Sequence, residues 1–279
     1  MYTGATAGLL ENIRSGVITI LDYMYCHGVK ENLDKAVIDA FKKTGIRGIL
    51  RRGYSDSTQF PADLACNYNE TETDFFNAID ELATLTKNTP RVTLAIAPGI
   101  IWDLSEEGLL KCREYANRYS IPITLHLVES PEDNAYSLSN HNMRAIPYLE
   151  KLGLLGPDFI AIHCVDMNSE DIDILAKHNV KVSHNSISNL IIGYNFSPVV
   201  TMKEKGVVVG IATDGAASND CQNMLEVLKI TSLIHKSVHQ NPKVLNQWEI
   251  IKMATIDGAK VLGKENEIGS IKVGKKLIY

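Results

Sequence analysis

The chain has 279 residues, a net charge of −5 at pH 7 and 45% hydrophobic residues. These values are ordinary for a globular enzyme, and they give no reason to expect nucleic acid or an anionic membrane as a partner. The longest apolar runs are only strand-sized, and the N-terminus is a poor signal peptide. Five scattered cysteines without a C-x-x-C pair favour reduced thiols, so we expect a cytoplasmic protein.

Short apolar runs alternate with amphipathic stretches along most of the chain. Seven runs predict strands at residues 17–24, 45–51, 92–97, 121–128, 159–165, 180–184 and 207–212. Helical patterns follow them, for example at residues 32–43 and 70–87, and another helix is predicted to start at Ser105. Strands that alternate with helices pair in parallel through right-handed crossovers. The pattern therefore predicts an α/β fold, a TIM-type (β/α) barrel with one of its eight strands missing.

The alternation of strands and helices ends beyond Leu262. The pattern at residues 267–279 indicates a turn and short strands. No linker, low-complexity segment or tandem repeat interrupts the chain before this point. We therefore predict a barrel over residues 1–265 and a separate strand segment over residues 266–279.

Polar side chains stand at the ends of four late strands. They are His126 with Glu129, then His163, then His184, and finally Asp214. In a barrel, residues at the C-terminal ends of strands meet at one mouth, so we expect these groups to face a common cavity. Imidazole nitrogen and carboxylate oxygen form the ligand set of a hydrolytic zinc or iron site. A metal would also explain why a carboxylate follows a buried strand at Asp214.

Each of these residues also has a structural interpretation. A single histidine at a strand end is more often hydrogen-bonded than a ligand. Asp214 belongs to an Asp-Gly turn dipeptide, and Glu129 can start a helix. Asn185 and Asn189 can be turn residues. Four such positions at successive strand ends nevertheless favour one shared site.

The strand-end motifs resemble the amidohydrolase superfamily. They are His-Leu-Val-Glu from His126, Ile-His-Cys-Val around His163, Val-Ser-His-Asn around His184 continuing to Ser188 and Asn189, and Asp-Gly-Ala-Ala-Ser-Asn from Asp214. The resemblance covers almost the whole chain, and the last motif is highly specific. It is closest to the branch that holds S-adenosylhomocysteine/methylthioadenosine deaminases, guanine deaminases and triazine chlorohydrolases. The sequence is therefore identified as a member of this superfamily.

The resemblance implies a role for each strand-end residue. His126 and Asp214 match metal ligands, and Asp214 also matches the base for the attacking water. His163 matches the histidine that helps to polarise that water, and it is the candidate third ligand. Glu129 matches the carboxylate that carries a proton to the substrate's ring nitrogen. His184 falls where the family has a histidine behind the metal ligands, and we include it among the substrate-binding candidates.

The resemblance also implies a cofactor and a substrate class. We expect one divalent ion, zinc in preference to iron, and a small heterocyclic substrate. Such an ion can lower the pKa of water from 15.7 to about 7, and the resulting hydroxide attacks a ring carbon that bears an amine or a halide. Arg52 resembles an arginine that contacts substrate in some deaminases. Trp102 could stack on a flat ring, although core packing is the alternative.

The sequence departs from the family at both ends. The family's first strand carries a His-x-His pair that binds the metal, and this sequence contains no such pair. Residues 17–24 match the second strand, so we expect strands 2–8 of an incomplete barrel. Residues 268–276 match the return into a small β-sandwich, of which we expect a remnant at the C-terminus. The sequence therefore resembles the interior of a longer protein.

The missing ligands lead to two expectations about activity. Either the chain pairs with another polypeptide, or it binds metal weakly or not at all and turns over little. Exposed parallel edges favour association, and we expect a homo-oligomer. Gly99 stands where adenosine-type deaminases tend to have a histidine, and Asp166 replaces another histidine. Both changes keep triazine-like and pterin-like rings open beside purines and nucleosides.

The predicted function is hydrolytic deamination of such an N-heterocycle by metal-activated water. One alternative is a chlorohydrolase or alkylamine hydrolase of the same family. The other is a catalytically silent barrel that acts only with a partner chain.

Overall fold

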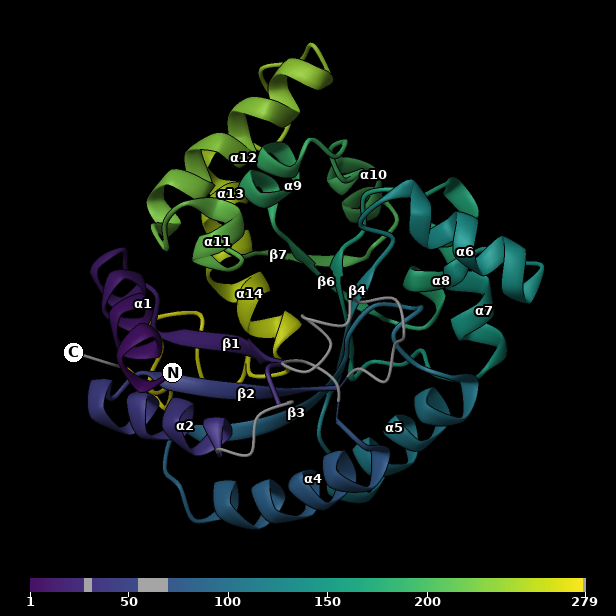
Figure 1. Cartoon of the computed structure of the whole chain (residues 1–279). Helices are drawn as coiled ribbons and strands as arrows, with labels where there is room; N and C mark the ends of the chain where they lie inside the picture. The colour runs from purple at the N-terminus through teal and green to yellow at the C-terminus, as the bar shows by residue number, and fades with distance from the viewer. Residues whose placement is uncertain (28–31, 55–69, 278–279) are drawn as a thin grey trace. The chain divides into compact units, whose positions relative to one another are not determined.

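The structure, a computed structural model, describes residues 1–27, 32–54 and 70–277 (Figure 1). The chain forms two compact units, Met1–Leu125 (unit 1) and His126–Tyr279 (unit 2). Cys66 and the last two residues of the predicted strand segment lie outside the described residues. All seven predicted strands are confirmed, each within three residues at either end.

Unit 1 holds three complete strands and the start of a fourth, all parallel. Residue Ile20 of the first strand is level with Gly48 of the second, and Ile96 of the third is level with Ile123 of the fourth. The second strand lies between the first and third, and it is buried along its whole length. The strands are β1 (Thr19–Met24), β2 (Arg47–Tyr54), β3 (Val92–Pro98) and β4 (Ile123–Leu127), whose second half belongs to unit 2.

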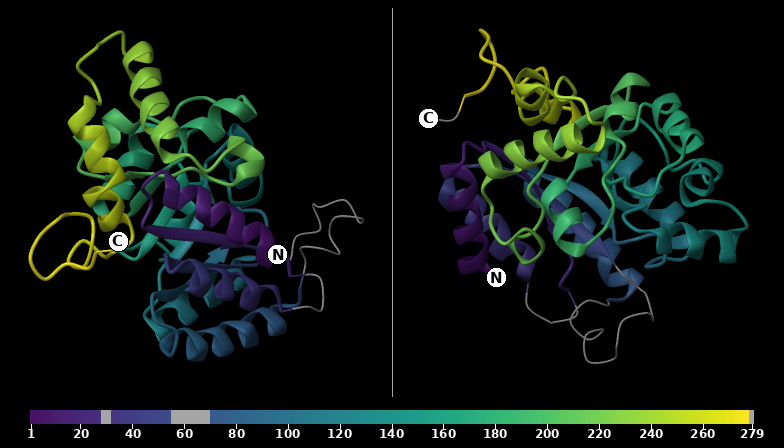
Figure 2. Two further views of the ribbon diagram at one scale, coloured as in Figure 1. Left: turned by 90° about the vertical axis from the view of Figure 1, so that its left-hand side faces the viewer. Right: turned by 90° about the horizontal axis from the view of Figure 1, so that it is seen from above.

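Helices connect these strands, and three of them begin at capping residues. The side chains of Asn32, Thr71 and Ser105 each accept a hydrogen bond from a backbone N–H in the first turn. The predicted start at Ser105 is thereby confirmed. The helices are α2 (Leu33–Thr44), α4 (Glu72–Lys87) and α5 (Glu106–Tyr119), and α1 (Tyr2–Arg14) precedes β1 and lies beside α2 (Figures 1 and 2).

Gly48 lets α2 approach β2 closely. A Cβ atom at Gly48 would lie 2.5 Å from the Phe41 ring, which is 1% exposed and cannot move into solvent. We expect Gly48→Ala to lower the free energy of unfolding by about 1–3 kcal/mol, because overpacking displaces the ring or the strand. Urea denaturation measures the change. Gly4→Ala in α1 is the control, since nothing lies within 4 Å of its Cβ position; equal effects of the two variants would contradict this account.

The strands of unit 2 are also parallel to one another. Ile160 is level with Lys181, and Val182 with Val209. The end of β4 meets the next strand through the hydrogen bond from Cys164 N to the Leu127 carbonyl, 3.1 Å long. Within unit 2 the order of strands along the sheet follows the chain. The further strands are β5 (Phe159–His163), β6 (Lys181–His184) and β7 (Val208–Ile211).

Helices alternate with these strands and extend beyond the last one (Figure 1). The packing of α14 on β7 is close, since a Cβ atom at Gly210 would lie 3.1 Å from the Gly258 Cα atom. The helices are α6 (Pro131–His141), α7 (Ala145–Lys151), α8 (Ser169–Lys177), α9 (Ser186–Ile192), α10 (Val199–Glu204), α11 (Ala216–Asn219), α12 (Met224–Val238), α13 (Gln247–Ala254) and α14 (Ile256–Val261).

The segment after α14 packs on that helix at Gly269, whose Cβ position would lie 2.6 Å from the Ala259 Cβ atom, and then extends away from it (Figure 2). The strand segment predicted for residues 266–279 is not confirmed, because residues 266–277 form turns and bends without a strand. Ile271 and Val273 are almost fully exposed, so their side chains do not pack in unit 2. Within the described ranges of the chain, no helix is both long and apolar enough to cross a membrane.

Candidate functional site

The predicted strand-end residues all lie in unit 2, at or just after the ends of strands. His126 is in β4, and Glu129 follows two residues after that strand. His163 and His184 are the last residues of β5 and β6. Asp214 follows β7 by three residues. The parallel sheet therefore presents all five side chains from the same end of its strands.

Four of these residues form one group, which we call the His163 cluster: His126, Glu129, His163 and Asp214. The Nε2 atom of His163 lies 3.5 Å from Glu129 Oε1 and 3.9 Å from Asp214 Oδ2. The His126 and His163 rings stack with their centroids 5.4 Å apart. His163 is 1% exposed, whereas the two carboxylates are about one-fifth exposed. The cluster thus combines a buried imidazole with carboxylates that solvent can reach.

Asn189 of α9 orients the His163 ring. Its Oδ1 atom lies 2.8 Å from His163 Nδ1, and the asparagine is itself 1% exposed. Because an amide oxygen only accepts hydrogen bonds, Nδ1 carries the proton. In the neutral ring, Nε2 therefore keeps its lone pair on the side of the carboxylates. The sequence offered Asn189 only as a turn residue, although it ends the same motif that contains His184.

The backbone is strained where it presents the cluster. Val128, His163 and Asp214 have φ angles of 45°, 72° and 68°, in the left-handed region. A β-branched residue such as Val128 is a clear outlier there. Such conformations cost about 1–3 kcal/mol each and persist where surrounding contacts hold them, commonly at functional sites. The strand ends of unit 2 are therefore held in a specific, costly geometry.

The two carboxylates of the cluster have opposite protonation tendencies. Burial, to which the charge of Asp214 adds, raises the pKa of Glu129 to about 7. Burial also opposes ionisation of Asp214, but the positive charge of a protonated His163, hydrogen bonds from the Ser188 side chain and the Gly215 N–H, and a protonated His126 together hold its pKa below the ordinary value. Neighbouring carboxyl groups whose pKa values diverge in this way can serve as acid and base.

The loop after β7 is held by its own side chains. Asn219 donates a hydrogen bond to the Thr213 carbonyl at 2.5 Å, and Gln222 donates one to the Asp214 carbonyl at 2.7 Å. The Gly215 N–H lies 2.6 Å from Asp214 Oδ1. These contacts fix the small-residue motif around Asp214. Sequence reasoning missed Gln222, which lies outside that motif.

His184 is buried next to another histidine. Its Nε2 atom lies 3.4 Å from Nε2 of His235 on α12, and both residues are at most 1% exposed. Burial, followed by the His235 ring, lowers the pKa of His184 to about 3. Burial also lowers the pKa of His235, to about 4. Both rings are therefore neutral near pH 7, and a contact of His184 with substrate stays a prediction.

The two other predicted substrate contacts lie in unit 1. Arg52 Nε is 2.9 Å from Asp34 Oδ2, and its Nη1 and Nη2 atoms are 2.5 and 2.8 Å from the Glu70 carboxylate. The three side chains are at most 8% exposed, so they form a buried ionic group, the Arg52 cluster. Trp102 is half-buried in the turn after β3. Substrate binding by Arg52 and Trp102 stays a prediction.

The space beside Gly99 is filled by a carboxylate. A Cβ atom at Gly99 would lie 2.0 Å from Asp103 Oδ2, which also accepts a hydrogen bond from Ile100 N at 3.0 Å. Asp103 is 4% exposed and cannot swing into solvent without losing this bond. A larger side chain at position 99 would therefore require Asp103 to move.

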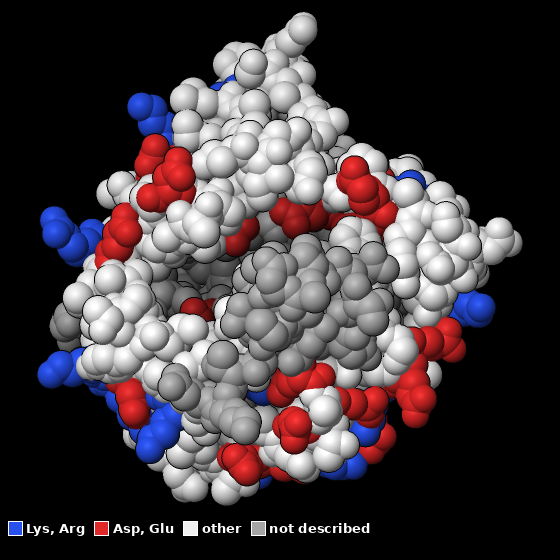
Figure 3. Space-filling model, viewed as in Figure 1, with Lys and Arg blue, Asp and Glu red and all other residues white. Residues whose placement is uncertain are grey.

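The donor chemistry of the His163 cluster fits a divalent cation. His126 and His163 supply imidazole nitrogens, and Asp214 supplies carboxylate oxygens, which are the ligand types of hydrolytic zinc sites. Over residues 1–27, 32–54 and 70–277, however, no three His, Cys, Asp or Glu side chains are already arranged around one metal position. On the face seen in Figure 3, the charged side chains next to α9 and α11 are acidic, which also suits a cation.

Comparison with protein families identifies the family of the chain. The model of the Amidohydrolase family matches residues 1–277. The chain is 35% identical to a 5'-deoxyadenosine deaminase of Methanobrevibacter smithii, over 99% of the chain and 60% of the relative. It is 34% identical to a 5-methylthioadenosine/S-adenosylhomocysteine deaminase of Thermodesulfovibrio yellowstonii, with the same coverage. It is 32% identical to an S-triazine hydrolase of Gordonia rubripertincta, over 85% of the chain and 52% of the relative.

Solved structures show the same fold. An adenosine deaminase from Xanthomonas campestris with bound zinc superposes with a TM-score of 0.89 at 25% identity, over 98% of the chain and 59% of that protein. An atrazine chlorohydrolase from Arthrobacter aurescens, complexed with zinc, gives 0.86 at 24% identity, over 97% and 61%. The fold is therefore part of a TIM-type barrel. The chain spans about 60% of the length of the two curated deaminases named above.

Proposed function

Because the chain belongs to the amidohydrolase family, we propose that it is the barrel part of a metal-dependent hydrolase that deaminates an N-heterocycle. The observation that carries this proposal is the placing of Glu129 and Asp214 beside Nε2 of His163, with pKa values shifted in opposite directions. Relatives at 34–35% identity are named as deaminases of adenosine derivatives, which supports the reaction type.

The proposal includes one divalent ion. His126 and Asp214 would hold it, with His163 as the adjacent third donor. When bound, such an ion lowers the pKa of water from 15.7 to about 7. We favour zinc over iron, because a similar adenosine deaminase structure, at 25% identity, contains bound zinc.

The residues of the His163 cluster divide the proton transfers between them. Asp214, held ionised, accepts a proton from the attacking water. Glu129, with a pKa of about 7, donates a proton to the ring nitrogen of the substrate as the ring carbon is attacked. His163 offers Nε2 as a hydrogen-bond acceptor because Asn189 holds its Nδ1 proton. Asp214 then passes the proton from water to the departing amine. The new hydroxyl on the ring carbon returns a proton to Glu129 as the C–N bond breaks, so water and the amino heterocycle give the oxo heterocycle and ammonia.

A second candidate is a hydrolase that releases halide or an alkylamine from a triazine-like ring. The position of Asp103 favours it, since this carboxylate fills the space that a histidine at position 99 would need. The similarity to an S-triazine hydrolase supports the same reading. We also propose that residues 1–265 form the barrel and that residues 266–279 form a segment of the sandwich. We further propose that the protein is a homo-oligomer and that it is located in the cytoplasm.

Metal removal tests the proposed function. We expect purified full-length protein, incubated with Zn²⁺, to release ammonia from 5'-deoxyadenosine or methylthioadenosine, and a chelator to abolish this activity until Zn²⁺ is added back. An ammonia assay run beside a chloride assay on a chlorotriazine separates the two candidates. Turnover that survives exhaustive chelation, or release of neither product, would refute the metal-dependent hydrolase.

A further inference from the structure

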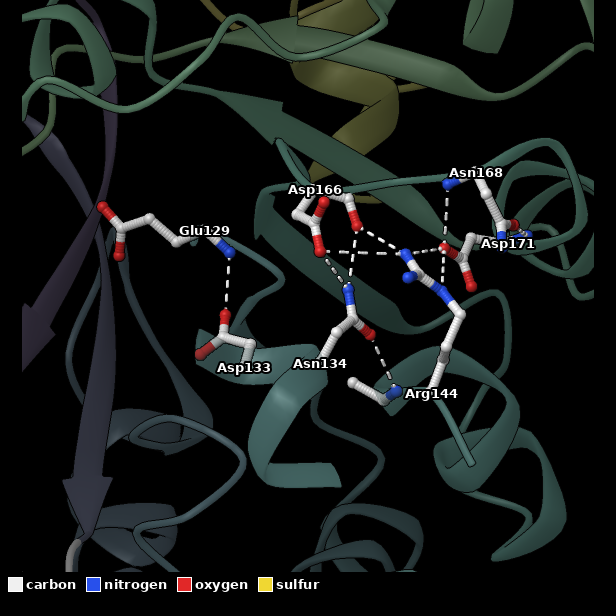
Figure 4. A network of polar contacts seen from close by, with 8 residues as sticks. Glu129, Asp133, Asn134, Arg144, Asp166, Asn168 and Asp171 are labelled. Carbon is white, nitrogen blue, oxygen red and sulfur yellow. Dashed lines mark hydrogen bonds and ion pairs between the residues drawn. The ribbon is translucent and has the colours of Figure 1, made fainter. Parts of the chain in front are cut away.

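The peptide group between Val128 and Glu129 is held at both of its ends. The Val128 carbonyl accepts hydrogen bonds from the N–H groups of Val165 and Asp166, at 2.9 and 2.8 Å. The Glu129 N–H donates to Asp133 Oδ2 at 2.8 Å (Figure 4). Hydrogen bonds at both ends of a peptide group fix the orientation of its plane. This plane in turn sets the direction in which the Glu129 side chain leaves the backbone.

Asp133 is buried in the first turn of α6. It is 1% exposed, and burial raises the pKa of its carboxyl to about 7 against the opposing effect of the Glu129 and Ser130 N–H groups. A helix needs acceptors for its first N–H groups, but Asp133 reaches back past the helix to the residue before the N-cap. Its contact with Glu129 therefore goes beyond ordinary capping of the helix.

Asn134, the next residue of α6, ties the same turn to the loop after β5. Its Nδ2 atom donates to the carbonyl and to Oδ2 of Asp166, at 2.9 and 2.7 Å, and its Oδ1 atom accepts from Ala145 N at 3.1 Å. Arg144 donates to the same Asp166 carbonyl at 2.7 Å and to Asp171. Figure 4 shows this network continuing from α6 to the start of α8.

These contacts form a closed frame around Val128. Asp166 donates its N–H to the Val128 carbonyl, and its own carbonyl and carboxylate are bound by Asn134. Asp133 closes the frame on the Glu129 side. Such a frame explains how Val128 keeps a φ of 45°, which a β-branched residue adopts only under constraint.

We propose that Asp133 is a positioning residue for Glu129, and that Asn134 and Asp166 complete the frame that holds the Glu129 carboxyl beside His163. The kinetic part of this inference rests on the proposed function, because it assigns Glu129 a proton transfer. The structural part concerns only the Glu129 backbone and can be measured without turnover.

Three variants test the proposal. Asp133→Ala removes the acceptor of the Glu129 N–H, whereas Asp133→Asn keeps one side-chain oxygen that can accept it. Glu249→Ala is the matched control, because Glu249 also lies in the first turn of a helix and accepts a backbone N–H, from Asn246 at 3.0 Å. It lies on α13, outside the frame.

The activity-independent measurement is amide hydrogen exchange in the full-length protein. We expect Asp133→Ala to raise the exchange rate of the Glu129 amide at least tenfold relative to the exchange rate of the Ile160 amide in β5. Asp133→Asn should give a ratio between those of Asp133→Ala and the wild type. Glu249→Ala should not change the ratio of the two rates. An unchanged ratio in Asp133→Ala overturns the proposal. If this variant does not fold, Asp133→Asn and Asn134→Leu decide by the same ratio.

The kinetic measurement separates positioning from a merely structural role. Because misplacing a catalytic group by 1 Å can cost on the order of 10²-fold in rate, we expect Asp133→Ala to lower kcat by about that factor with KM unchanged. Asp133→Asn should recover part of kcat, and Glu249→Ala should leave it as in the wild type. Equal kcat values for Asp133→Ala and Glu249→Ala overturn the proposal. A wild-type protein without turnover refutes the proposed function instead, and the exchange ratio still decides on positioning.

Discussion

Replacing Glu129 with Gln is expected to lower kcat/KM of the full-length protein by about 10²–10⁴-fold, the usual worth of a general acid or base. The carboxamide matches the carboxyl in shape and hydrogen-bonding reach, but it cannot release a proton to the substrate. Its contact with His163, 3.5 Å in the wild type, can persist, so substrate binding should change little. Steady-state kinetics of ammonia release, with KM and kcat determined separately, measure the effect.

The pH dependence of kcat/KM follows from the protonation state of Glu129. With a pKa of about 7, Glu129 is protonated below neutrality and ionised above it, so kcat/KM of the wild type should fall as pH rises through about 7. The Gln variant should lose this limb, because its side chain does not titrate. Glu132→Gln is the control, since Glu132 lies in the first turn of α6 and is fully exposed. Wild-type kinetics in Glu129→Gln would remove Glu129 from the mechanism.

The strands of both units were predictable because their signal is local. Runs such as residues 207–212 are apolar without interruption, as expected for parallel strands buried on both faces. Once the strands are placed, the parallel order puts His163 and Asp214 at the same end of the sheet without knowledge of any contact. The grouping of the candidate site therefore follows from strand ends and topology alone.

The partners of these residues were not predictable, because tertiary contacts choose them. Nothing local distinguishes Asn189, which binds His163, from an asparagine in a turn, and nothing marks Asp133 as the acceptor of the Glu129 N–H. The sequence did not predict helix α1, because this segment lacks a broad apolar face. Only Leu9 and Asn12 of its residues are buried.

Arg52 has a structural environment that its motif did not predict. At the end of an expected strand, it resembles an arginine that contacts substrate, and that role stays a prediction. In unit 1 its guanidinium faces two carboxylates and lies over the Phe75 ring, with its centre 5.5 Å from the ring centroid. Burial raises the pKa of both Asp34 and Glu70, so the guanidinium stabilises charges that burial disfavours.

We expect Arg52→Met to lower the free energy of unfolding by about 3–5 kcal/mol at pH 8, because removing one partner of a buried ionic group leaves the others uncompensated. Methionine preserves much of the side-chain volume, so the loss reports charge and hydrogen bonding more than packing. Arg118→Met is the control, since Arg118 is half-exposed, pairs with the exposed Glu114 and lies over the Tyr115 ring, and its loss should cost much less than that of Arg52. Urea denaturation at several pH values provides the measurement.

The pH dependence separates this structural role from substrate binding. The folded-state pKa of Asp34, about 6, lies above its value in an unfolded chain, so its contribution to stability is present below that unfolded value and is lost as pH rises through about 6. Without Arg52 the carboxyls of Asp34 and Glu70 should hold their protons more tightly, and the variant's deficit should be small near pH 4 and grow above pH 6. A deficit below about 1 kcal/mol at every pH would contradict the ionic role. If KM rises in that case, Arg52 contacts the substrate instead.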